Sequence, residues 1–487
     1  MPGPARHLHR RSRATSSHDS PLAPFPGCPG RPPGTWGVFY GGFVLVLQRP
    51  WFALVLFLAL QLVVVQSSNT KSKTLREPFL CQDFEYFLDA IRHPRLYVPF
   101  FGIGLAIGAS LAGLATIIGF LVIEPTLSSR HGAGAFLFGT VLIIALSILP
   151  LVAGLRYLPA CRLDPLDDTR RLGLFSALWA YGLMARRPLE VSASPYPPVP
   201  EPVPDTARLP HLVVVQSESF FDPRPWHGGL RDDLLPKLDA LTEQALARGR
   251  LRVPAWGANT VRTETAVLTG LDQDTLGIHR FNPYHQLARR SVPSLAAELR
   301  QLGYRTVCLH PYAASFYQRD RVMPRLGFDD FIDIRAFGLD DYCGQYVGDL
   351  ALADKVGSLL HETDNEPLFV FVITMENHGP LQFDNRAENA ARDLLAPGAP
   401  PCRTTAGSWP AIWPTCAMPI AWPDACASNW RRCPGPGYCA GMATMCRSCP
   451  RSIGIMASRT ATRPICCGRA MAGQTGPRRP RHLRQCN

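Results

Sequence analysis

Acidic residues and lysine are almost absent from the last part of the chain. Residues 401–487 contain 12 arginines, no lysine and one acidic residue, Asp424, so they carry 12 − 1 = +11 of the formal net charge of +12. The first 400 residues are therefore close to neutral, at 12 − 11 = +1. This distribution excludes a uniformly basic surface of the kind that binds nucleic acid, and we expect no nucleic-acid partner.

Charged residues are also absent from two long apolar runs, Val98–Ile123 and residues 134–155. A third apolar run covers Trp51–Gln66. About 20 apolar residues span the hydrocarbon core of a bilayer, so these runs predict a multi-pass transmembrane region over residues 36–190. The shorter run Leu172–Met184 fits either a fourth span or an interfacial helix.

Between and after the apolar runs, lysine and arginine gather in residues 71–95 and 156–171, whereas the loop between the second and third runs has only Arg130. The positive-inside rule places both segments in the cytoplasm, and a crossing by Leu172–Met184 would then leave everything after it outside. If Leu172–Met184 crosses, we therefore expect a multi-pass membrane protein whose soluble domain lies on the outer side. Residues 1–35 have no apolar periodicity and are predicted to be disordered.

Proline is dense in residues 191–210, which predicts a semi-rigid linker. Beyond it, short β-branched runs alternate with helical segments, which predicts an α/β domain with a mostly parallel central sheet over residues 211–384. Glu218, His310 and the Glu376-Asn377-His378 group each follow a predicted strand. The carboxyl ends of parallel strands are where sites gather, so these polar residues are candidates.

Single residues leave their roles open. The carboxylate of Glu218 can bind a hard cation or be a solvated helix cap, while Thr260 opens a helix and can be a nucleophile or only an N-cap. Arg319 offers a planar fork for phosphate, and His310 and His378 can donate protons or hydrogen bonds.

The ordered set QSESF, GANTVRTE, LHPY-x5-QRD-x6-GFDDF and TMENHGP is more specific. It resembles the lipoteichoic acid synthase and phosphoglycerol transferase family, within the alkaline phosphatase/sulfatase superfamily. The resemblance covers roughly Leu212–Pro380, together with the membrane region and linker that precede it. It implies a fold in which a multi-span helical membrane region is followed by a sulfatase-like α/β domain.

The resemblance also implies roles for individual residues. Glu218 matches a ligand of Mn²⁺ or Mg²⁺, and Thr260 matches a metal-bound nucleophile that carries glycerophosphate as a covalent ester. The residues expected to bind the headgroup or line its pocket are His310, Tyr317, Arg319 and His378. The implied enzyme takes its donor, a phosphatidylglycerol-type lipid, from the membrane and transfers glycerophosphate to a glycan or a polyglycerophosphate polymer.

The family's adjacent Asp-His metal ligands are missing, because no Asp-His pair follows Pro380. Gly441–Cys446 requires the codons GGN ATG GCN ACN ATG TGY, which from the third base can spell Tyr-Gly-Asp-His-Val. We therefore infer a reading-frame shift between about Phe383 and Pro401. The catalytic domain, residues 211–384, is then incomplete, and residues 385–487 are expected to be out of frame and unstructured.

Other interpretations fit less well. Ten of the 15 cysteines lie after residue 400, but no second CxxC or matching His pair accompanies Cys446 and Cys449, which argues against a zinc site. A disulfide framework rarely holds so many Trp and Met residues. Two alternatives to the transferase remain: a catalytically inactive membrane protein made from a frameshifted gene, and a sulfatase-like hydrolase. The hydrolase is disfavoured because Thr260-Val-Arg-Thr lacks the C/S-x-P-x-R pattern.

Overall fold

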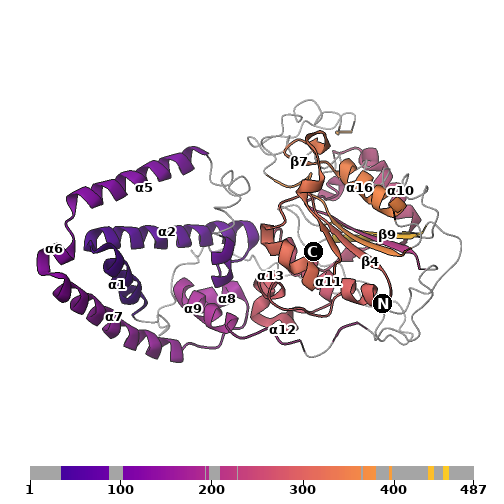
Figure 1. Cartoon of the computed structure of the whole chain (residues 1–487). Helices are drawn as coiled ribbons and strands as arrows, with labels where there is room; N and C mark the ends of the chain where they lie inside the picture. The colour runs from indigo at the N-terminus through magenta and orange to yellow at the C-terminus, as the bar shows by residue number, and fades with distance from the viewer. Residues whose placement is uncertain are drawn as a thin grey trace, which may run out of the picture. The chain divides into compact units, whose positions relative to one another are not determined.

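The computed structural model describes residues 34–86, 103–191, 194–196, 209–226, 229–362, 366–379, 394–396, 437–443 and 453–459 (Figure 1). Residues 1–33, most of the proline-rich linker and most of residues 385–487 lie outside this description. The chain divides into two compact units, Met1–Cys81 with Ala115–Leu183, and Gln82–Leu114 with Met184–Asn487.

Three of the described helical stretches are long and apolar enough to cross a membrane: Pro50–Leu75, Ile107–His131 and Ala133–Arg156. The helices of this part of the chain are α1 (Thr35–Leu47), α2 (Pro50–Leu75), α5 (Ile103–Ile123), α6 (Leu127–His131), α7 (Ala133–Arg156), α8 (Pro165–Leu172) and α9 (Leu174–Ala185). The apolar helices predicted before residue 190 are thus present. Helix α9 has only 12 residues, fewer than a straight span requires.

A carboxylate caps the start of α2. The backbone N–H groups of Trp51 and Phe52 both donate to the Glu124 carboxylate at 2.9 Å, and Arg49 Nε donates to the Glu124 carbonyl at 2.7 Å. The first N–H groups of a helix have no partner within it, so the carboxylate satisfies two of them. These bonds join the turn before α2 to the turn after α5.

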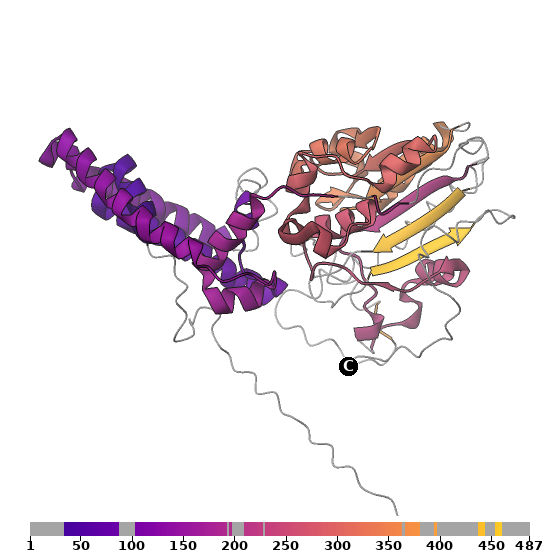
Figure 2. The ribbon, with the colours of Figure 1, turned by 90° about the horizontal axis from the view of Figure 1, so that it is seen from below.

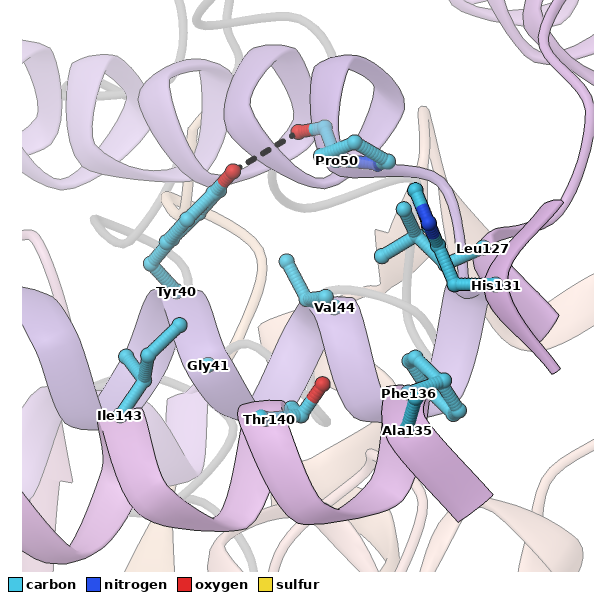
Figure 3. Close-up of a pocket in the computed structure, with 11 residues that line it drawn as sticks. Tyr40, Gly41, Val44, Pro50, Leu127, His131, Ala135, Phe136, Thr140 and Ile143 are labelled. Carbon is cyan, nitrogen blue, oxygen red and sulfur yellow. Dashed lines mark hydrogen bonds between the residues drawn. The ribbon is translucent and has the colours of Figure 1, made fainter. Parts of the chain in front are cut away.

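A cavity of about 380 Å³ lies beside these turns, between α1, the start of α2, α6 and α7 (Figure 3). Val44, Phe136 and Ile143 give it an apolar lining, and the Tyr40 hydroxyl donates to the Pro50 carbonyl at 3.3 Å across one side. The cavity belongs to the helical unit and shares no residue with the candidate site described below.

The second unit contains an eight-stranded sheet. Its strands run in the order β2 (Ala245–Ala247), β10 (Ile453–Arg459), β9 (Gly437–Ala443), β1 (His211–Ser217), β8 (Leu368–Ile373), β4 (Arg305–Leu309) and β5 (Asp330–Ile332), and β3 (Arg250–Leu251) pairs with β10. All neighbours from β9 to β5 are parallel, and β10 is antiparallel to its partners. This confirms the predicted α/β domain with a mostly parallel central sheet.

Both faces of the sheet are covered, and β8 shows how its sequence achieves this. Phe369, Phe371 and Ile373 pack with α11 (Thr260–Thr269), α13 (Pro283–Leu287), α14 (Leu295–Gln301) and α15 (Arg319–Arg325), whereas Val370 and Val372 pack with α16 (Asp349–Glu362). Successive side chains of a strand point to opposite faces, so a continuous apolar run is what a strand covered on both sides requires.

One part of the chain differs from the sequence prediction. Helix α10 (Pro236–Gln244) leads directly into β2, which pairs with β10. Residues 437–443 and 453–459, expected to be unstructured, form β9 and β10 beside β1 (Figure 2). Without β9, the backbone N–H and C=O groups along one edge of β1 would have no strand partner. A strand of almost any sequence can pair with such an edge, because the pairing is made by backbone groups.

The turn that follows α15 gives a test of the packing. Gly327 has φ +91°, and a Cβ atom there would lie 2.7 Å from the backbone of Ala297. We expect Gly327→Ala to cost about 2 kcal/mol or more, through both clash and backbone strain, and to lower the melting temperature of the detergent-solubilised chain by roughly 4 °C or more. Gly338→Ala is the matched control, because its added Cβ would meet no atom closer than 3.9 Å. Equal effects of the two substitutions would contradict this packing.

Candidate active site

The candidate residues meet where three adjacent parallel strands end. Glu218 follows β1, His310 follows β4, and residues 374–378 follow β8, which lies between β1 and β4. The backbone N–H of Glu218 donates to the Thr374 hydroxyl at 3.0 Å, and His310 Nδ1 lies 3.1 Å from the Ile373 carbonyl oxygen. The strand ends are thus tied together, and Glu218 and His310 occupy one edge.

Thr260 is brought to Glu218 by the start of α11. It is the first residue of that helix, and its Oγ1 donates to Glu218 Oε1 at 3.1 Å. The cap position is held by Asn259, so the interpretation of Thr260 as an N-cap is wrong. A hydroxyl at a helix N-terminus lies where the backbone N–H groups and the helix dipole stabilise an anion.

A buried ion pair stands one turn further along α11. Arg319 Nη2 donates to both carboxylate oxygens of Glu264, at 2.9 and 3.2 Å, and the two side chains are 1% and 0% exposed. The Tyr284 hydroxyl donates to Glu264 at 2.5 Å, and Gln216 Nε2 donates to it at 3.3 Å. Four elements, β1, α11, α13 and α15, therefore converge on one carboxylate.

The guanidinium of Arg319 is only partly used by this pair. Its Nε and Nη1 atoms are buried, and they have no hydrogen-bond partner among the described residues. A buried donor without a partner is costly, so these two N–H-bearing atoms favour an oxyanion as the missing acceptor. The structure therefore leaves a positively charged fork beside Glu218 and Thr260.

Electrostatics tie the remaining polar groups to this cluster. Burial, and then the charge of Glu264, raises the pKa of Glu218 to about 7, against the opposing effects of Arg319 and of the hydrogen bond from Thr260. Burial, together with the positive charge of Arg319, holds the pKa of His310 well below its usual value. His310 is thus neutral near pH 7 and offers one ring nitrogen as an acceptor or a donor.

Aromatic rings form one wall of the site. Arg319 Cζ lies 5.4 Å from the ring centroid of Tyr317, which contacts Phe316 at 4.2 Å. His378 contacts the ring of Tyr346 at 6.0 Å, and its Nδ1 lies 2.7 Å from the Gly379 carbonyl oxygen. Tyr317 is therefore in direct contact with the arginine, whereas His378 contacts Tyr346.

Backbone strain is concentrated beside these residues. Seven non-glycine residues in the described part of the chain have positive φ, and four of them adjoin the site: Ser219 (62°), Asn259 (64°), Tyr317 (55°) and Gln318 (57°). Each precedes or follows Glu218, Thr260 or Arg319. The left-handed region costs a non-glycine residue on the order of 1 kcal/mol, and such outliers cluster at functional sites.

The described residues do not complete a site for a divalent metal ion. Glu218 and Thr260 supply two neighbouring oxygen ligands, but no group of three His, Cys, Asp or Glu residues within the described residues could hold a metal. Mg²⁺ and similar hard cations take about six oxygen ligands, several of them water, and are usually held by more than one carboxylate. The Mn²⁺ or Mg²⁺ expected from the sequence therefore lacks most of its protein ligands here.

Sequence reasoning did not identify the partners of Arg319. Glu264 lies in the GANTVRTE motif, four residues after Thr260, but Tyr284 and Gln216 carry no local signal of their role. Sequence reasoning singled out Glu376 but missed Asp349, whose backbone N–H donates to Glu376 Oε2 at 2.7 Å. Burial, then the charge of Glu376, raises the pKa of Asp349 well above its usual value. Only their spatial proximity, through β8 and α16, reveals this pair.

Removing one charge of the buried pair provides a stability test. Glu264→Gln leaves Arg319 buried without a counter-ion, and we expect it to lower the free energy of unfolding by about 3 kcal/mol or more. The half-exposed pair of Arg305 and Asp330, 2.7 Å apart, is the matched control, because Asp330→Asn is expected to cost about 1 kcal/mol or less. Chemical denaturation of the full chain measures both. A Glu264→Gln variant as stable as Asp330→Asn would contradict the importance of the pair.

Comparisons with known proteins agree with the fold and the motifs. The sequence profile of the family described as Sulfatase matches residues 210–397. The chain is 28% identical over 363 residues to the capsular polysaccharide biosynthesis protein RkpI of Rhizobium meliloti, covering 70% of this chain and 66% of that protein. It is 31% identical over 184 residues to a protein described as a putative cyclic beta-1,2-glucan modification protein of the same organism, covering 38% of this chain and 28% of that protein.

A solved structure extends the likeness into the helical part. The integral membrane protein lipooligosaccharide phosphoethanolamine transferase A of Neisseria meningitidis matches with a TM-score of 0.50 at 14% identity, covering 85% of this chain and 79% of that one. At this identity the match shows the fold alone. The chain spans about two thirds of its capsular relative. Together, the profile, the sheet and the motifs show that residues 210–397 are a sulfatase domain of the alkaline phosphatase/sulfatase superfamily.

Proposed function

We propose that this chain represents a membrane-anchored phosphoglycerol transferase, which moves glycerophosphate from a phosphatidylglycerol-type lipid to a cell-envelope glycan or polymer. The observation that carries the proposal is the position of the Thr260 hydroxyl. It lies at the N-terminus of α11, bonded to Glu218, with unused donors of the buried Arg319 in the same cluster. A nucleophile, a proton acceptor and an oxyanion-binding group are thus present together.

The proposed chemistry has two steps. Thr260 Oγ attacks the donor phosphorus, a Thr260 O–P bond forms, the bond from phosphorus to the diacylglycerol oxygen breaks, and diacylglycerol leaves. An acceptor hydroxyl then attacks the same phosphorus and releases Thr260. Glu218 accepts the proton of the Thr260 hydroxyl and passes it to the departing diacylglycerol oxygen, and in the second step it accepts the proton of the acceptor hydroxyl and returns it to Thr260. Arg319 and the N-terminus of α11 stabilise the phosphoryl oxygens. Because the described residues do not complete a metal site, no step is derived through Mn²⁺ or Mg²⁺.

The acceptor and the location follow from the relatives' printed functions and from the helices. The two Rhizobium proteins are described by a capsular polysaccharide and by a glucan, which favours an envelope glycan as the acceptor, with polyglycerophosphate as the alternative. A lipid donor suits an enzyme anchored by apolar helices. We propose that the sulfatase domain lies on the outer side of the bacterial inner membrane, where such glycans are assembled.

We further propose that the reading frame shifts between about residues 383 and 401. The sheet register supports this. Ser217 of β1 pairs with Ala443 of β9, so the chain leaves β9 next to Glu218. The Asp-His pair that the alternative frame can encode falls at this position, directly after residue 443. Restoring the frame would therefore place a carboxylate and an imidazole beside Glu218 and Thr260, the groups that the described residues lack.

The alternative function follows from the same observation. The chain as translated is then a catalytically inactive membrane protein, because its cation site keeps two ligands. A sulfatase-like hydrolase remains less favoured, since Thr260 is not in the sequence context that sulfatases use for their modified nucleophile.

Metal titration separates the two candidates. We expect the frame-restored chain to bind Mn²⁺ at least about a hundredfold more tightly than the chain as translated, because it regains two ligands. Isothermal titration of both proteins in the same detergent measures this. Equal affinities would refute the frame-shift proposal, whatever the activity of either protein.

Substitution of the nucleophile tests the covalent step. In the frame-restored chain, Thr260→Ala is expected to reduce turnover of a labelled phosphatidylglycerol analogue by at least about a thousandfold and to abolish the labelled protein ester. Thr265→Ala is the control, because its hydroxyl donates to the Val261 carbonyl at 2.7 Å within the same helix. Retention of full turnover by Thr260→Ala would end the assignment of Thr260 as the nucleophile.

A further inference from the structure

The segment that follows α2 is built into the sulfatase domain. Glu85 Oε2 accepts from Asn282 Nδ2 at 2.8 Å, and Glu85 Oε1 lies 2.6 Å from Nδ1 of His285. The ring of Tyr86 meets that of Tyr317 edge to face, with centroids 5.7 Å apart and planes at 82°. All these residues belong to the same compact unit, Gln82–Leu114 with Met184–Asn487.

These contacts reach both sides of the buried arginine. Asn282 and His285 flank Tyr284, whose hydroxyl bonds Glu264, and Tyr317 lies under the guanidinium of Arg319. Glu85 thus binds the segment that carries Tyr284, a hydrogen-bond partner of Glu264. Tyr86 packs against Tyr317, the ring that contacts Arg319. Glu85 and Tyr86, which lie between two apolar helices, are therefore structural neighbours of the candidate site.

From this contact we propose a membrane topology: the chain crosses the membrane twice between Glu85 and the sulfatase domain, through α5 and α7, and α9 lies along the membrane surface without crossing it. Glu85 touches the domain, so both lie on the same side. The number of crossings between them must then be even, and α5 and α7, with 21 and 24 residues, supply two. A crossing by α9 would make the number odd.

Two independent observations fit this count. Helix α9 has 12 residues, which at 1.5 Å per residue is about 18 Å, well short of the roughly 30 Å hydrocarbon core. In addition, the turn before α2 is bonded to the turn after α5, through Arg49 and Glu124 and through the Leu127 N–H and the Gln48 carbonyl at 2.8 Å. If α2 and α5 each cross once, these two turns must lie on the same side, opposite the domain.

The proposal corrects the orientation drawn from the charges. The positive-inside rule put residues 71–95 on the side opposite the soluble domain, but Glu85 contacts that domain. On the proposed topology both basic segments, residues 71–95 and 156–171, lie on the side of the domain, against the positive-inside rule, and the contact of Glu85 is the observation that outweighs the rule. The topology does not depend on the proposed transferase activity, because it follows from the contacts of Glu85 and from helix lengths.

Single-cysteine labelling of the full chain in membranes tests the topology. In a chain whose native cysteines are replaced by alanine, exposed positions are returned one at a time as Thr74→Cys, Ser129→Cys, Ala160→Cys and Ser358→Cys. With a membrane-impermeant maleimide on intact spheroplasts, we expect the cysteines at residues 74, 160 and 358 to give the same result, all labelled or all protected. The cysteine at residue 129 is expected to give the opposite result. The cysteine-free chain is the blank. If residues 160 and 358 label from opposite sides, α9 crosses and the proposal fails.

Cross-linking tests the contact itself. Glu85→Cys with His285→Cys is expected to be joined by a short bis-maleimide, whereas Ser129→Cys with His285→Cys is not. Absence of the first cross-link, or formation of the second, would overturn the docking of this segment. Should the cysteine-free chain fail to fold, an epitope inserted after Ala160 in the native chain, probed with antibody before and after permeabilisation, decides the side. Its exposure on the side opposite the domain would refute the proposal.

Discussion

The ion pair of Arg319 and Glu264 is the interaction on which the rest of the site depends. Two full charges removed from water are tolerated only when each has several partners, and here the carboxylate receives donors from Arg319, Tyr284 and Gln216. Because Glu264 shares α11 with Thr260, the same bonds fix the position of the Thr260 hydroxyl relative to the guanidinium. The same burial excludes water from the two guanidinium donors that have no partner. A hydrogen bond from such donors to an anion is stronger in this low-dielectric environment than in water.

The sequence predicted the sheet well because its strands are local patterns. The β-branched and aromatic runs at residues 211–217 and 368–373 must form strands buried on both faces, and the polar residues after them then share an edge. The position of Thr260 at a helix start was also predictable, although its hydroxyl points to Glu218 instead of capping the helix. Tyr284 was not predictable, because its role arises from a contact across 20 residues of chain that no short motif records.

The differences between the sequence analysis and the later results have physical causes. The orientation drawn from lysine and arginine counts disagrees with the topology proposed here, because such counting cannot register that Glu85 contacts Asn282 and His285 nearly 200 residues away. The tail was expected to lack structure because its side chains have no apolar period. Strand pairing, however, is made by backbone groups, and the exposed edge of β1 accepts β9 in parallel register over seven residue pairs.

The strained residues beside the site have a consequence for how the domain moves. At about 1 kcal/mol each, Ser219, Asn259, Tyr317 and Gln318 store a few kcal/mol in the loops that carry the site, while the sheet beneath has no such strain in its buried strands. Relief of that strain favours local opening of these loops over opening of the sheet, so amide exchange in the loops would outpace exchange in β8. If the proposed phosphoryl group binds Arg319, its affinity would then include the free energy needed to hold these loops in their strained conformation.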